Sequence, residues 1–184
     1  TEDGSITTLG RGGSDLTATL IAAAINADEV WLWKEVDGIM TTDPKIEPKA
    51  KTIKQISYLE AMEMSYFGAK MMHPGAIEIV MEKGIPIRVK NTFNPTNPGT
   101  LITKEQQVEP SAVVKAISLI RKAALITVEG ASMFGTPGTA AKLFSILGEK
   151  NINVLMISQS SSEANISFVI PRERLSDALS ALEI

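Results

Sequence analysis

The sequence predicts an α/β protein in two parts, a mostly parallel sheet covered by helices and then a small α+β unit. Strand-length and helix-length apolar segments alternate from residue 1 to about residue 102. The segment 103–112, TKEQQVEPSA, is polar, contains a proline and has no apolar period, which is typical of a linker. Residues 113–184 then show the order strand, helix, strand, strand, helix, with one extra leading strand.

In the first part, short apolar runs indicate strands, and longer runs with helix formers or capping residues indicate helices. Ser57 and Glu60 form a capping-box pair before one helix, while Pro74 and Gly84 begin and end the next. The expected strands are 6–9, 29–33 and 85–90, and the expected helices are 16–25, 58–66 and 74–83. A sheet of this kind binds ligands at the carboxyl ends of its strands.

In the second part, four apolar runs predict strands and two longer runs predict helices. The strands are expected at 114–120, 124–129, 154–158 and 166–170, and the helices at 139–149 and 172–182. Because so short a unit buries little apolar surface, we expect it to pair with another copy.

Composition excludes several classes of function. The 184 residues are 44% hydrophobic with a net charge of −3, so the chain folds and has no global attraction for nucleic acid or acidic membranes. There is no cysteine and one histidine, His73, which excludes thiolate and multi-histidine metal sites. No apolar run approaches the ~20 residues that span a bilayer. We expect a cytoplasmic protein, and we interpret His73 as structural or a helix cap.

The glycine-rich turn at residues 10–15 has the features of an anion site. Its three glycines let backbone N–H groups approach a ligand before a helix N-terminus. Arg11 offers a planar fork of donors to a carboxylate, and Asp15 offers a charge to an ammonium group, which together suit an amino acid. Ser14 or Asp15 is expected to cap the helix. The alternative is a tight structural turn with a capping serine and a solvent-facing arginine.

The loop 33–45, WKEVDGIMTTDPK, follows a predicted strand and is a candidate nucleotide loop. Thr41 and Thr42 could support backbone amides that face a nucleotide, and Lys34 and Lys45 could reach phosphates. Lys70, between two helices, could neutralise phosphate in the same crevice. The alternatives are an ordinary polar loop and solvated lysines.

The loop 130–138, GASMFGTPG, precedes the first helix of the second part and suits the carboxylate of a free amino acid. Neutral hydrogen-bonding groups follow on the adjoining strands, and the alternative is a polar hairpin with ordinary turn residues. These groups are Gln159, Ser160, Ser161, Ser162 and Asn165.

On these motifs the chain resembles aspartokinase, a member of the amino acid kinase family. The resemblance rests on residues 9–18, 36–45, 58–74, 84–95 and 99–102, while residues 114–170 resemble the first ACT domain of that enzyme. It implies the C-terminal half of an amino acid kinase sandwich at residues 1–102 and an incomplete, ferredoxin-like ACT domain at 113–184.

The resemblance implies ATP-dependent, Mg²⁺-assisted phosphorylation of L-aspartate to 4-phospho-L-aspartate, in the synthesis of lysine, threonine and methionine. Residues matching Arg11, Ser14 and Asp15 would bind aspartate, with Arg11 and Lys70 as catalytic residues and no metal-ligating residue assigned. The residues that would line the ATP site are Lys34, Glu35, Gly38, Met40, Lys45 and Lys70. Many relatives have Thr-Asp, Tyr and Arg in place of Lys34-Glu35, Met40 and Lys45.

The ACT-like part implies feedback regulation by threonine or lysine, and its glutamine and asparagine pattern is closer to threonine-responsive relatives. The implied effector-binding residues are Met133, Gly135, Thr136, Gly138, Thr139, Ala140, Asn153, Val154, Gln159 and Asn165.

The family's opening Lys-Phe-Gly-Gly strand and second ACT domain are not in this sequence. We therefore expect that the chain alone does not phosphorylate aspartate, and that it forms homo-oligomers through ACT pairing or through the absent catalytic half. The alternative is a non-catalytic, effector-binding and dimerising regulatory subunit. Another amino acid kinase, such as glutamate 5-kinase, is disfavoured by the ACT-like part.

Overall fold

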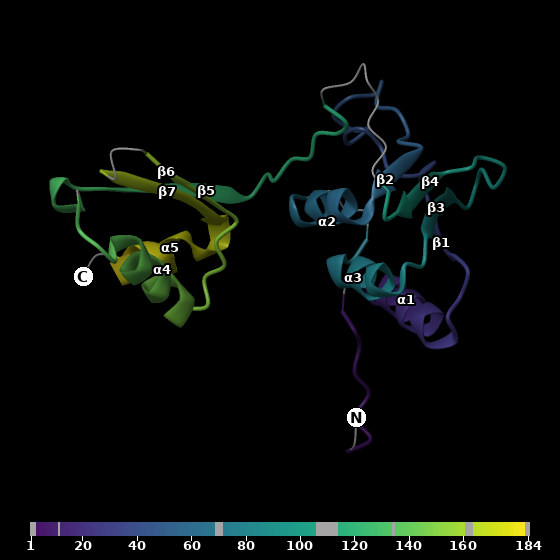
Figure 1. The fold of residues 1–184 in the computed structure, drawn as a ribbon, viewed down its shortest axis with the longest axis horizontal. Helices are drawn as coiled ribbons and strands as arrows, with labels where there is room; N and C mark the ends of the chain where they lie inside the picture. Colours follow the sequence, from purple (N-terminus) through teal and green to yellow (C-terminus); the bar gives the residue numbers. More distant parts are fainter. Residues whose placement is uncertain are drawn as a thin grey trace. The chain divides into compact units, whose positions relative to one another are not determined.

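The computed structural model describes residues 3–10, 12–68, 72–105, 114–133, 135–160 and 164–182. The chain divides into two compact units, Thr1–Leu119 and Ile120–Ile184 (Figure 1). Each unit has its own hydrophobic core. Within the described residues, no helix has both the length and the apolar character needed to cross a membrane.

The first unit contains a four-stranded mixed sheet. Its strand order is β1-β3-β4-β2, with β1 paired parallel to β3, β2 parallel to β4, and β3 antiparallel to β4. The strands are β1 (Val30–Lys34), β2 (Gln55–Ser57), β3 (Ile87–Asn91) and β4 (Thr100–Thr103). The α/β fold class is confirmed, and in register Lys34 at the end of β1 lies beside Asn91 at the end of β3.

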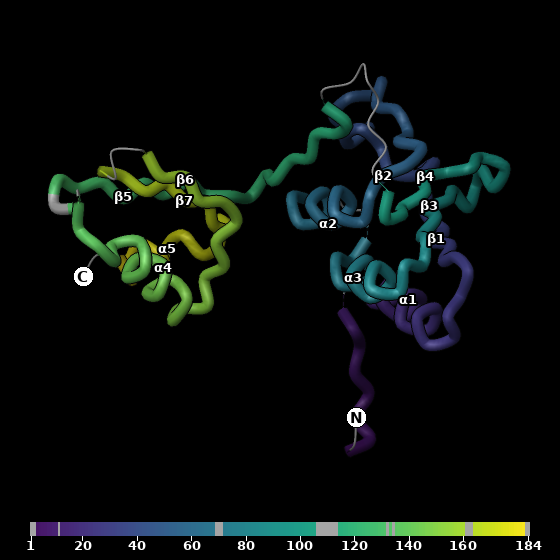
Figure 2. Tube along the Cα trace, viewed as in Figure 1, coloured from purple at the N-terminus to yellow at the C-terminus, as the bar shows by residue number. Residues whose placement is uncertain are grey.

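The described residues of this unit form three helices: α1 (Gly13–Ile25), α2 (Tyr58–Tyr66) and α3 (Pro74–Lys83). Helices α1 and α3 lie side by side (Figure 2). Val30 and Leu32 of β1 are buried in the core with Ala22 of α1 and Ile77 of α3. The alternate side chains Trp31 and Trp33 are about half exposed, at 49% and 45%. The period of two along a strand therefore places both tryptophans on the opposite face of the sheet.

The predicted helix boundaries are confirmed where capping residues define them. Glu60 N–H donates to the Ser57 hydroxyl at 3.2 Å, and Ser57 N–H donates to the Glu60 carboxylate at 2.8 Å. His73 caps α3, where its Nδ1 accepts from Gly75 N–H at 3.1 Å. Gly84 ends α3 in the left-handed conformation, with φ 68°. Burial raises the pKa of Tyr58, whose hydroxyl donates to the Ile85 carbonyl at 2.8 Å.

The second unit is an antiparallel sheet, ordered β5-β7-β6, packed against two helices. Phe168 of β7 and Leu147 of α4 are fully buried at its centre. The elements are β5 (Ala123–Glu129), a 3-10 turn (Ala131–Met133), α4 (Thr139–Glu149), β6 (Met156–Gln159), β7 (Asn165–Pro171), a second 3-10 turn (Arg172–Arg174) and α5 (Leu175–Leu182).

Two predicted strands are wrong. Residues 6–9 form no strand, and Ile6 and Leu9 are exposed. Residues 114–120 form no strand either, and Val114, Ile117 and Leu119 are exposed. Residues 114–119 belong to the first unit instead: Ile117 N–H donates to the Thr41 carbonyl at 2.8 Å, and Lys115 pairs with Glu60 at 2.8 Å. An apolar run forms a strand only when the backbone of a neighbouring strand can hydrogen-bond with it.

Candidate functional site

The glycine-rich turn leads into α1 differently from the prediction. Gly12 is the N-cap, with φ 80° and no capping side chain, so the expected cap by Ser14 or Asp15 is wrong. Both residues lie in the first turn of the helix, Ser14 exposed and Asp15 buried. A Cβ on Gly12 would lie 3.0 Å from the Cβ of His73. A glycine at the cap thus permits both the positive φ and the close approach of His73, the residue that caps α3.

Asp15 and Lys34 form an ion pair that joins two of the predicted motifs. The Lys34 ammonium donates to Asp15 Oδ1 at 2.7 Å, with side chains 29% and 8% exposed. No described residue donates to the second oxygen, Oδ2. A buried carboxylate needs a nearby positive charge, and the end of β1 supplies it. The predicted aspartate-binding residue and the predicted phosphate-binding residue are therefore in direct contact.

The loop after β1 is held against β3 and β4. Asp37 accepts hydrogen bonds from the side-chain amides of Asn91, at 2.7 Å, and Asn94, at 3.2 Å. Gly38 has φ 121° and is buried against Thr100. The Thr100 hydroxyl accepts from Ile39 N–H at 2.8 Å and donates to the Ile53 carbonyl. Sequence reasoning missed Asn91, Asn94 and Thr100, although three asparagines between residues 91 and 97 were a visible signal.

The rest of the predicted nucleotide loop is placed less directly. Met40 is half-buried, and Thr52 Oγ1 contacts its sulfur at 3.5 Å. Glu35 and Lys45 are exposed, and within the described part of the chain nothing joins either to the Asp15–Lys34 pair. The Thr41 hydroxyl accepts from Lys51 N–H at 3.0 Å. Thr41 thus supports the backbone amide of Lys51, and the role of Thr41 and Thr42 beside a nucleotide stays a prediction.

Several predicted site residues lie outside the described residues, so their roles stay predictions. These are Arg11, Lys70, Ser161 and Ser162. Among the described residues, no three acidic or histidine side chains come together as a metal site.

The predicted effector residues form two groups in the second unit. The first group lies in the loop between β5 and α4 and contains Gly135, Thr136 and Gly138. This loop starts at the end of the sheet where β6 ends at Gln159 and β7 begins at Asn165. The Thr139 hydroxyl donates to the Thr136 carbonyl at 3.0 Å, and Gly138 is the N-cap of α4 with φ 86°. Met133 and Ala140 contribute to the hydrophobic core.

Asn153 and Val154 belong to the other group, because they precede β6. The four residues of β6 span about 13 Å, at about 3.3 Å per residue. Within one copy, therefore, Asn153 lies at the far end of β6 from Gln159. Val154 is half-buried against the core, whereas Asn153 is exposed.

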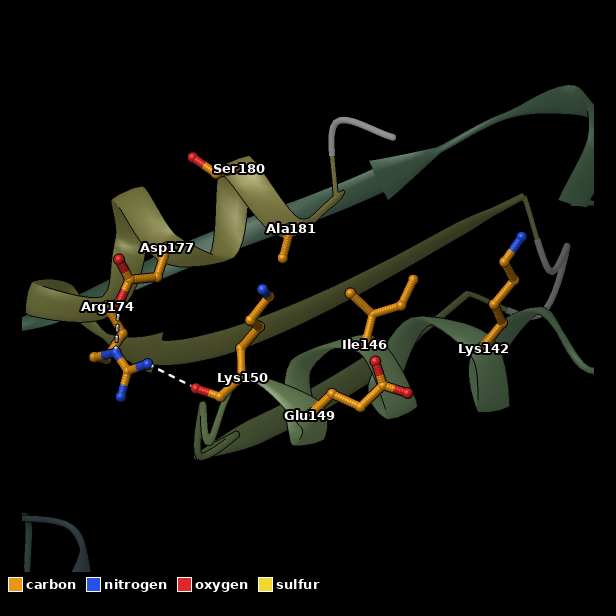
Figure 3. Close-up of a pocket in the computed structure, with 8 residues that line it drawn as sticks. All are labelled: Lys142, Ile146, Glu149, Lys150, Arg174, Asp177, Ser180 and Ala181. Carbon is orange, nitrogen blue, oxygen red and sulfur yellow. Dashed lines mark hydrogen bonds and ion pairs between the residues drawn. The ribbon is translucent and has the colours of Figure 1, made fainter.

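A separate groove of about 520 Å³ lies between α4 and α5, and none of the predicted effector residues lines it. Arg174 closes one end: its guanidinium donates to the Asp177 carboxylate at 3.0 Å, to the Lys150 carbonyl at 2.8 Å and to the Asn151 carbonyl at 3.2 Å. Figure 3 shows this arginine joining the two helices. The contacts fasten α5 to the end of α4.

The chain matches two family models. Residues 1–91 match the amino acid kinase family, and residues 126–183 match an ACT domain. It is 42% identical over 179 residues to bifunctional aspartokinase/homoserine dehydrogenase 1, a chloroplastic protein of Zea mays, a match that covers 96% of this chain and 20% of that protein. The chain thus spans about a fifth of that relative's length, and the relative's compartment leaves our cytoplasmic assignment a prediction.

Two solved structures of E. coli aspartokinase III are also similar. The complex with aspartate and ADP gives a TM-score of 0.77 at 38% identity, covering 92% of this chain and 37% of that one. The complex with lysine and aspartate gives 0.74 at 36% identity, covering 98% and 41%. The chain belongs to the amino acid kinase family, as an aspartokinase homologue in which the kinase fold is followed by an ACT domain.

Proposed function

We propose that this chain contributes to the aspartate and ATP sites of an aspartate kinase and binds a feedback effector through its ACT domain. The observation that supports this best is the 2.7 Å contact between Asp15 and Lys34. It places an acceptor for a substrate ammonium group beside a cation that can face phosphate. The similar E. coli enzyme was solved with aspartate, which carries an ammonium group, and with ADP, which carries phosphates.

In the proposed phosphoryl transfer, Asp15 binds the ammonium group of L-aspartate through Oδ2, while Oδ1 keeps its ion pair with Lys34. Lys34 Nζ has three N–H donors and uses one on Asp15, so the other two can reach phosphate oxygens. A side-chain carboxylate oxygen of aspartate attacks the γ-phosphorus, the bond from that phosphorus to the bridging oxygen breaks, and ADP leaves. Catalysis is then mainly positioning and neutralisation of charge.

Arg11 would bind a carboxylate of the substrate and Lys70 would neutralise phosphate, as their motifs predict. Mg²⁺ would arrive on the nucleotide phosphates and neutralise charge there. Glu35, Gly38, Met40 and Lys45 complete the proposed nucleotide-binding set. We expect the 184-residue chain alone to bind these ligands without turnover.

The second unit would bind threonine or lysine. The residues of the proposed effector site sit at both ends of β6, which favours a site completed by a second copy of the unit. An amino acid is too small to contact Asn153 and Gln159 of one copy together.

Titration calorimetry on the whole chain tests the proposal. We expect MgADP and L-aspartate to bind, and Asp15→Asn to weaken L-aspartate more than tenfold, because truncating one partner of a buried charge pair costs about 2–5 kcal/mol. Asp28→Asn, the same charge change at an exposed residue, should leave both affinities unchanged. Binding of threonine or lysine without MgADP or L-aspartate would favour the regulatory-subunit alternative.

A further inference from the structure

Asp37 is held by two neutral side chains just beyond the ends of β1 and β3. Asn91 Nδ2 donates to Asp37 Oδ1 at 2.7 Å, and Asn94 Nδ2 lies 3.2 Å from Oδ1 and 3.4 Å from Oδ2. Asp37 is half-buried, and no described cation pairs with it. The carboxylate of Asp37 therefore accepts its hydrogen bonds from the turn at the end of β3, here called the asparagine turn (residues 91–97).

The asparagine turn is itself braced, so it can hold Asp37 in a fixed place. Asn94 N–H donates to the Asn91 carbonyl at 3.2 Å, and Asn97 N–H donates to the Asn94 carbonyl at 3.1 Å. The side-chain oxygen of Asn91 accepts from Phe93 N–H at 2.9 Å. The side-chain oxygen of Asn94 accepts from the Thr96 hydroxyl at 3.3 Å. The amide oxygen of each asparagine that reaches Asp37 is thus engaged inside the turn, which fixes the direction of its Nδ2 donor.

The same turn also contacts the residue that carries the proposed phosphate-binding cation. Thr92 N–H donates to the Lys34 carbonyl at 2.9 Å, beyond the last rung of the β1–β3 ladder. On the other side, Thr100 holds Ile39. The backbone from Lys34 to Ile39 is therefore fixed at its start, at Asp37 and at its end, while Glu35 and Val36 between these points are exposed.

We propose that Asp37, Asn91 and Asn94 are positioning residues for nucleotide phosphate, which fix the loop 35–40 and thereby aim Lys34. The inference rests on the proposed function, because it deepens the assignment of this loop to a nucleotide. None of the three residues needs to touch the ligand. Their hydrogen bonds remove the loop's freedom before binding, and a preorganised site loses less free energy to ordering.

The chemistry of the pair allows a swap of its two partners. Asn91→Asp places a second carboxylate where the amide donated at 2.7 Å, and like charges at this distance repel. One oxygen of the new carboxylate at position 91 can still accept from Phe93 N–H, so the turn keeps that bond. Adding Asp37→Asn to the same chain restores an amide facing a carboxylate, with the donor on the opposite residue.

The experiment combines MgADP titration with hydrogen exchange of the amides of residues 35–40, on the whole 184-residue chain. We expect Asn91→Asp to raise the MgADP Kd at least tenfold and to speed exchange of these amides. The double variant should return both values to within threefold of the wild type. The matched control is Asn97→Asp, in the same turn, whose side-chain oxygen accepts from Gly99 N–H at 2.9 Å in the wild type and can still do so.

The outcomes separate the two claims. Wild-type exchange rates in Asn91→Asp, or a double variant as impaired as the single one, would overturn the positioning role. A wild-type chain that binds no MgADP, while the exchange rates respond as expected, would instead overturn the nucleotide function of the loop. Circular dichroism of each variant checks that it remains folded.

Discussion

Gly38 and Thr100 lie so close that a Cβ atom on the glycine would stand 2.5 Å from the threonine hydroxyl and 2.8 Å from its backbone nitrogen. Thr100 has no exposed surface and bonds to both Ile39 and Ile53, so it cannot move aside without breaking those bonds. Residue 38 is thus restricted to glycine by contact as well as by its φ of 121°.

Gly38→Ala should therefore lower the free energy of unfolding of the first unit by about 3 kcal/mol or more, as overpacking and backbone strain add. Urea unfolding measures the loss. The control is Gly84→Ala, where φ is 68° and a Cβ would meet nothing within 4 Å, so only the strain of about 1–2 kcal/mol remains. Equal losses at the two positions would contradict the proposed crowding.

Lys34→Met should destabilise the chain by about 1–3 kcal/mol, because the buried Asp15 loses its counter-charge. In the double variant with Asp15→Asn much of this loss should be regained, which a double-mutant cycle measured by urea unfolding would detect. The Arg88–Glu29 pair, with both side chains 27% exposed, is the comparison. Its coupling energy should stay below about 1 kcal/mol.

Tyr58 predicts a stability change at high pH. Its pKa is raised by burial, so above pH 10 the unfolded phenol ionises while the folded one keeps its proton. The unfolded state then binds fewer protons, and the free energy of unfolding should fall as pH rises above 10. Tyr58→Phe removes this slope, whereas Tyr66→Phe, at a 65% exposed residue, should keep it. Chemical denaturation at about pH 9 and about pH 11, on either side of the usual tyrosine pKa, measures the difference.

Threonine should raise the thermal midpoint of the second unit more than lysine does, because neutral amides and hydroxyls surround the proposed effector site. Gln159→Ala should reduce the threonine shift, while Lys142→Ala, in the groove between α4 and α5, should not. Differential scanning calorimetry with either amino acid makes the comparison. Identical shifts with both ligands, or none, would be evidence against a threonine site.

Local chemistry made some elements predictable. Ser57 with Glu60 defined the start of α2, and Pro74 and Gly84 defined both ends of α3, because capping depends on neighbours in sequence. The segment 114–120 was predicted wrongly because a strand needs a partner that no local pattern specifies.

The candidate site was predictable as motifs and not as contacts. Asp15 and Lys34 were each singled out and assigned to different ligands, and only the packing of α1 beside β1 reveals their ion pair. Asn91 and Asn94 could not be singled out from the sequence, because their partner Asp37 lies 54 and 57 positions earlier in the chain.

The two tryptophans of the chain, Trp31 and Trp33, alternate along a single strand with the Lys90 ammonium 4.8 Å and 5.5 Å from their rings. Their emission consequently reports on one unit alone. Far-UV circular dichroism reports on both units, so comparing the two signals during unfolding distinguishes one cooperative transition from two. Because Trp33 adjoins Lys34 in sequence, the same fluorescence offers a label-free signal for ligands arriving at the end of β1.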